Sequence, residues 1–155
     1  MVNLLLNVSF GILILMPQGW IIMILIMMLE SVITSELLCK RILEGRITAT
    51  VFLGNIISGL FGIIITLILN GGWWMVVWFP WVSSHEVDFS IPNALIGFII
   101  YYIVAFVLSV VIELLINYFM LGRIYSAKII FRTTLLANLA SYYFGSIIIY
   151  SLGFF

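Results

Sequence analysis

A pattern of polar and small residues occurs twice in this chain, and the second copy starts 83 residues after the first. The pattern reads T-x-x-L-x-N-x-x-S-x-x-F-G, from Thr50 to Gly62 and again from Thr133 to Gly145. Matching leucines carry little information in an apolar chain, whereas matching Asn and Ser residues carry much. The sequence therefore predicts a tandem duplication in which each copy contributes the same structural unit.

The composition excludes an ordinary soluble domain. Hydrophobic residues make up 65% of the chain and charged residues only 8%, against roughly 25% charged residues in typical soluble proteins. A chain of 155 residues cannot bury that much apolar surface in one soluble core, because small domains leave a large share of their surface exposed. We expect an integral membrane protein with the lipid bilayer as its solvent. The net charge is zero and there is no basic run, so we expect no nucleic-acid partner.

Four hydrophobic stretches are long enough to cross a bilayer as helices: about 18–39, 48–70, 94–121 and 130–152. Helices are expected because they satisfy their own backbone hydrogen bonds in lipid. The predicted fold class is therefore all-α, with four transmembrane helices arranged as two parallel-repeat hairpins.

The predicted organisation has four parts. Residues 1–16 form a short apolar N-terminal segment, 17–72 the first hairpin, 73–92 an outer loop rich in tryptophan, and 93–155 the second hairpin. The N-terminal segment is short for a membrane span, and the sequence leaves open whether it crosses the bilayer.

The basic residues predict the orientation. All six lie in or beside the two short connections within the hairpins: Lys40, Arg41, Arg46, Arg123, Lys128 and Arg132. By the positive-inside rule both connections should be cytoplasmic and the C-terminus outside, as in a multi-pass protein of a bacterial inner (plasma) membrane. The two halves would then share one orientation and be related by a pseudo-two-fold axis along the membrane normal.

Each predicted hairpin also carries a carboxyl and an amide at the same depth. Glu30 lies ten residues before Lys40, and Asn55 lies nine residues after Arg46, so both should sit about 13 to 15 Å from the cytoplasmic boundary at the helical rise of about 1.5 Å per residue. The second copy repeats this geometry. The predicted intramembrane polar cluster consists of Glu30, Asn55, Ser58, Glu113, Asn138 and Ser141.

Two interpretations of this cluster stay open. Glu–Asn contacts can join helices, with each contact worth about 1 kcal/mol or less. Alternatively, intramembrane carboxyl groups can form a proton or cation relay, or hold the polar end of a lipid-like ligand. In either case an ionised carboxylate is costly there, so each glutamate should be protonated, paired or open to an internal water cavity.

Small residues recur every fourth position beside the asparagines. These small-residue stripes are Gly54, Ser58 and Gly62 on the second predicted helix, and Ala137, Ser141 and Gly145 on the fourth. Small residues at this spacing allow close helix packing. We expect the two stripes to meet at the pseudo-axis, with Ser58 close to Ser141 and Asn55 close to Asn138.

Enzymatic chemistry is not indicated. His85 is the only histidine and Cys39 the only cysteine, and no G-x-S-x-G, H-E-x-x-H or P-loop motif occurs. One histidine beside Glu86 and Asp88 in a single loop is too common a grouping to indicate a metal site. We expect no catalytic residue, no metal and no cofactor.

The first copy resembles a family of small bacterial membrane proteins. The matching features are M-P-Q-G-W at 16–20, the helix bearing Glu30, the Lys40–Arg41 turn and N-x-I-S-G-L-F-G from Asn55. They are similar to the first hairpin of the filament-integrity (FraC-like) family, and L-A-N-L-A-S-Y-Y-F-G from Leu136 is similar to the same Asn-x-x-Ser hairpin. The resemblance implies a structural or assembly role at a membrane or cell–cell junction, although the family pattern is expected once per chain and stands here twice.

The expected function is therefore a structural, assembly or accessory-subunit role, with other membrane proteins or further copies of the chain as partners. The alternative is a small transporter or channel with Glu30 and Glu113 as relay groups. The sequence specifies neither a cellular process nor a substrate.

Overall fold

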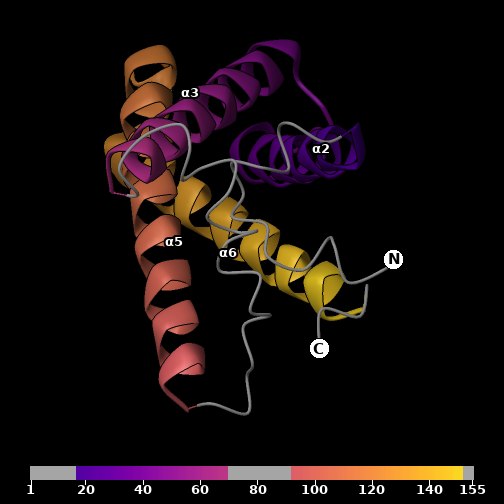
Figure 1. Ribbon diagram of the computed structural model, residues 1–155. Helices are drawn as coiled ribbons and strands as arrows, with labels where there is room; N and C mark the ends of the chain where they lie inside the picture. Colours follow the sequence, from indigo (N-terminus) through magenta and orange to yellow (C-terminus); the bar gives the residue numbers. More distant parts are fainter. Residues whose placement is uncertain (1–16, 70–91, 152–155) are drawn as a thin grey trace.

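The structure is a computed structural model in which residues 17–69 and 92–151 are described. Four helices make up these ranges, which contain no strand: α2 (Pro17–Cys39), α3 (Gly45–Leu69), α5 (Pro92–Leu121) and α6 (Ala127–Ser151) (Figure 1). The all-α prediction is confirmed, and each helix begins and ends within three residues of its predicted range. The N-terminal segment and almost all of the outer aromatic loop lie outside the described residues.

Each helix packs against two of the other three. The contacts are α2 with α3 and α5 with α6 inside the hairpins, and α3 with α5 and α2 with α6 between them. Exchanging α2 with α5 and α3 with α6 leaves this set unchanged, as a pseudo-two-fold relation between the hairpins requires. The arrangement is a four-helix bundle in which each helix of one hairpin contacts one helix of the other.

The prediction that the second and fourth helices meet is wrong. No Cα atoms of α3 and α6 lie within 8 Å of one another in the described ranges, so Ser58 does not approach Ser141 as expected. The two helices occupy opposite corners of the bundle.

A small hydrophobic cluster closes one end of the bundle. Ile47 and Val51 of α3 pack there with Leu121 of α5 and Ile130 of α6. Both hairpin connections therefore lie at this end, which we call the connection end. From it α5 and α6 run apart (Figure 1).

The interior away from this cluster is polar and the surface is apolar. Eleven polar or charged residues are buried in the described ranges, against seven hydrophobic ones. Large hydrophobic side chains are exposed along every helix, such as Ile21 (62% exposed), Leu60 (54%), Ile100 (56%) and Tyr143 (72%). This distribution is the reverse of that in a water-soluble bundle.

One described segment, Tyr102–Leu121 of α5, is long and apolar enough to cross a membrane, with a mean hydropathy of 2.3. Length and composition of a single helix are weak support for a membrane location. For the other three helices, the expectation of a span rests on the sequence pattern and on the apolar surface.

The two hairpin connections are built differently. Lys40 ends α2 with a positive φ of 59°, in the left-handed region that closes many helices. Glu44 then caps α3, because its Oε2 accepts a 2.8 Å hydrogen bond from the Ile47 N–H. At the other connection Gly122 donates its N–H to the Tyr118 carbonyl at 2.9 Å. A Cβ atom on Gly122 would lie only 2.4 Å from that oxygen.

Replacing Gly122 with alanine should therefore destabilise the fold, because the clashing partner is a backbone oxygen that cannot move aside. We expect a loss of about 1 to 3 kcal/mol in unfolding free energy, as for other overpacked sites. Gly45→Ala is the matched control, since a Cβ atom at Gly45 would have nothing within 4 Å of it. Denaturant titration in detergent, followed by circular dichroism, measures both; equal stabilities would contradict the prediction.

Candidate functional site

The two glutamates lie inside the bundle, and each binds the asparagine of its own hairpin. The Asn55 Nδ2 of α3 donates to the Glu30 Oε2 of α2 at 2.6 Å. The Asn138 Nδ2 of α6 donates to the Glu113 Oε2 of α5 at 2.7 Å. Each carboxyl and its amide are thus level on neighbouring antiparallel helices.

Each glutamate also faces a serine of the other hairpin. The Ser58 hydroxyl donates to the Glu113 Oε1 at 3.3 Å. At the equivalent place Ser141 lies beside the Glu30 side chain, and its hydroxyl donates to the Asn138 carbonyl at 3.0 Å. The six predicted residues therefore form two equivalent groups, each with a carboxyl, an amide from the same hairpin and a hydroxyl from the other. We call these six residues the polar joint.

The helices hold the donor groups of the polar joint in place. The Asn55 amide also donates to the Val51 carbonyl one turn earlier, at 3.1 Å, and Asn138 does the same to Thr134 at 3.2 Å. The Ser58 hydroxyl bonds to the Asn55 carbonyl at 3.1 Å. Because these local bonds fix the side chains within the N-x-x-S motif, the motif presents its amide and hydroxyl on one helix face.

The two carboxyl groups of the polar joint are buried with Asn138 and Ser141, whereas Asn55 and Ser58 are partly exposed. Glu30 is 2% exposed, Glu113 4% and Asn138 1%. The hydrogen-bond donors that the structure gives the two carboxyl groups are neutral amides and hydroxyls, because every Lys and Arg lies at or near the connection end. None of these donors carries a charge.

The small-residue stripes serve this joint rather than an α3–α6 contact. A Cβ atom on Gly54 would lie 3.3 Å from the Glu113 Cγ, so the missing side chain lets α5 approach α3. On α6, Ala137 and Gly145 are buried. Gly62 is exposed, and no atom lies within 4 Å of its Cβ position. The stripes do not meet because α3 packs against α5 and α6 against α2, which are the glutamate-bearing helices of the opposite hairpins.

The second hairpin contains further polar contacts, and of their residues only Asn117, which matches Thr34 at the offset of the repeat, was indicated by the repeat pattern. The Asn117 Nδ2 donates to the Thr134 Oγ1 at 2.9 Å. Tyr102 donates to the Tyr142 carbonyl at 2.7 Å, and the Tyr142 hydroxyl lies 3.0 Å from the Ser109 Oγ. At the offset of the repeat, Thr134 corresponds to Val51 and Tyr142 to Gly59. The sequence signal for Thr134 and Tyr142 was this departure from the repeat. A polar side chain that occurs in only one copy indicates a contact that only that copy makes.

Two amide oxygens in the second hairpin have no hydrogen-bond partner. They are the Oδ1 atoms of Asn117 and Asn138, and both residues are buried. No group of three or more His, Cys, Asp and Glu residues that could hold a metal ion occurs in residues 17–69 and 92–151. The His85 loop lies outside those ranges. Cys39 bonds to the Ser35 carbonyl at 3.2 Å, as a small side chain at a helix end does.

Comparison with known proteins identifies no relative: no family model matches the chain, and neither a curated protein nor a solved structure does. The function must therefore be inferred from the polar joint and from the surface around it.

Replacing Gly54 with leucine should push α3 and α5 apart, because the side chain would meet Glu113. We expect a loss of about 1 to 3 kcal/mol in unfolding free energy. Gly62→Leu, two turns further along the same helix, should cost nothing and can gain up to about 1 kcal/mol from helix propensity. Thermal unfolding of the two variants in detergent distinguishes them; the same loss in both would show that Gly54 has no special contact.

Replacing Asn138 with leucine should leave the buried Glu113 Oε2 without its donor, at a cost of about 1 to 3 kcal/mol. In a double-mutant cycle with Glu113→Met, the combined loss should be smaller than the sum of the two single losses. The measurement is the unfolding free energy of the four proteins. Additive losses would mean that the amide and the carboxyl do not stabilise each other.

Proposed function

We propose that this protein is an integral membrane protein of four spans whose role is structural, as an assembly factor or accessory subunit. The membrane location is supported by the apolar surface on all four helices and by the polar interior. In a bilayer the exposed side chains contact lipid or other membrane proteins, and the buried polar groups find partners only within the bundle.

The observation that carries the structural role is the exchange of hydrogen bonds between the hairpins. Both oxygens of Glu113 have donors, one from each hairpin. The joint therefore uses its carboxyl groups to fix how two hairpins meet. A rigid core of this kind leaves the outer helix faces as the surface for partners, which are other membrane proteins or further copies of the chain.

The proposed topology follows from the basic residues. The connection end faces the cytoplasm and the C-terminus lies outside, in the inner membrane of a bacterium. The FraC-like resemblance agrees with a structural role, since it points to assembly at a membrane or cell–cell junction.

The second candidate function is a small transporter or channel in which Glu30 and Glu113 relay protons or cations. The unpartnered Asn138 Oδ1 favours it, because this buried acceptor belongs to the amide that binds Glu113. A relay group must release its proton or cation during each cycle, whereas a structural joint stays closed.

The double variant Glu30→Gln and Glu113→Gln separates the two functions. Glutamine keeps the length of the side chain and one carbonyl acceptor for the asparagine amide, so the fold should survive with a loss of about 1 kcal/mol or less. We expect the variant to assemble like the native protein, as measured by size-exclusion chromatography and by the set of proteins that co-purify in mild detergent.

Proton and cation flux into proteoliposomes provides the second measurement. We expect no flux from the native protein above that of empty liposomes. Flux in the native protein that disappears in a normally assembled double variant would establish the relay and overturn the structural role.

A further inference from the structure

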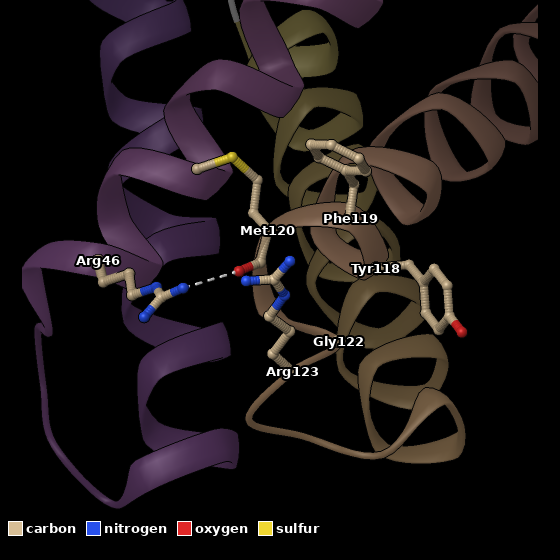
Figure 2. A pocket seen from close by; sticks show the side chains of 6 residues that line it. All are labelled: Arg46, Tyr118, Phe119, Met120, Gly122 and Arg123. Carbon is tan, nitrogen blue, oxygen red and sulfur yellow. Dashed lines mark hydrogen bonds between the residues drawn. The ribbon is translucent and has the colours of Figure 1, made fainter.

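A hollow at the connection end brings together arginines of both hairpins. It lies where α3 begins and α5 ends, and it is lined by Arg46, Tyr118, Phe119, Met120, Gly122 and Arg123 (Figure 2). Arg46 belongs to the first hairpin and Arg123 to the second. The hollow therefore exists only when the two hairpins are packed together, unlike a basic patch on one helix.

The two guanidinium groups retain free hydrogen-bond donors. Arg46 Nη2 donates to the Met120 carbonyl at 3.2 Å, which ties it to the last turn of α5 and uses one of its five N–H groups. Neither arginine pairs with a carboxylate of the described residues. Figure 2 shows both guanidinium groups directed toward the Met120 carbonyl. Two converging guanidinium groups suit an oxyanion such as phosphate, which arginine binds through paired N–H donors.

The rest of the hollow is apolar and exposed. Phe119 is 86% exposed and Tyr118 56%, and the large apolar side chain of Ile124 on the adjoining connection is 54% exposed. A free phosphate ion would use only the arginines. A lipid would use both parts, with its phosphate on the guanidinium groups and its acyl chain along the aromatic side chains.

We propose that this hollow binds the phosphate headgroup of an anionic membrane lipid, with Arg46 and Arg123 as its ligands. The proposal rests on the membrane location proposed above, because the connection end must lie at the headgroup level of the cytoplasmic leaflet.

The repeat supplies an internal comparison. At the offset of 83 residues, Arg46 corresponds to Ile129, Phe119 to Glu36 and Arg123 to Lys40. The three equivalent positions thus carry one basic residue instead of two, and a carboxylate where the hollow has an aromatic ring. One lipid site per chain is expected, between α3 and α5.

The test is native mass spectrometry of the protein released from nanodiscs of phosphatidylglycerol and phosphatidylcholine in equal amounts. We expect one phosphatidylglycerol to be retained per native chain. The double variant Arg46→Gln and Arg123→Gln should reduce this retention about tenfold or more, because the charge-assisted N–H donors of both guanidinium groups to the phosphate are lost. Arg46→Ile, which copies the residue of the second repeat, should have a similar direction of effect with less disturbance of the fold.

The matched control is the double variant Lys128→Gln and Arg132→Gln, which removes the same charge from the connection end but outside the hollow. It should retain the lipid. Equal loss in the control would overturn the site in favour of a general basic surface, and displacement of the lipid by inorganic phosphate at millimolar concentration would assign the hollow to free phosphate.

Two further outcomes separate this proposal from the proposed function. A native protein that enters nanodiscs as a folded bundle but retains no phosphatidylglycerol would overturn the lipid site alone. A protein that does not enter nanodiscs, and stays folded without detergent, would overturn the membrane location and the lipid site with it.

Discussion

The fold depends on the need to satisfy a carboxyl group in an apolar environment. A buried Glu113 offers two oxygens, and a single neighbouring helix supplies a donor to only one of them. The second donor, Ser58, comes from the other hairpin. At Glu30 the corresponding serine of the other hairpin is Ser141. These carboxyl groups bind the hairpins to each other away from the connection end, where the hydrophobic cluster of Ile47, Val51, Leu121 and Ile130 joins them. The order of helices around the bundle agrees with both contacts, since α3 packs on α5 and α2 on α6.

The sequence predicted much of the fold. The lengths of the hydrophobic stretches predicted the four helices and their approximate bounds. Counting residues from the basic connections predicted that Glu30 lies level with Asn55. Those quantities are local, since they depend on helical rise and on the distance along one hairpin. The helix against which each small-residue stripe packs is not determined by the local sequence. Which helix Gly54 and Ser58 face depends on the rotation of every helix about its axis, and four apolar surfaces with little amphipathic contrast do not reveal that rotation.

The two repeats differ at positions that do not belong to their shared pattern. The second hairpin has gained the Asn117–Thr134 bond and the contacts around Tyr142, where the first has valine and glycine. The first has Arg46 where the second has Ile129. The shared residues maintain the joint, whereas the differing residues give the two faces of the bundle different chemistry. A pseudo-symmetric protein can in this way present one specialised site instead of two equal ones.

The crossed hydrogen bonds make each hairpin depend on the other. A hairpin that carries glutamate, asparagine and serine but has no second hairpin leaves its carboxyl one donor short, and its serine without a carboxyl to bind. Two identical hairpins related by a two-fold axis would supply each other with both. The two halves of this chain therefore meet as the two subunits of such a homodimer would. Because the halves are joined in one chain, each can carry residues that the other lacks, such as Arg46 in the first half and Thr134 in the second.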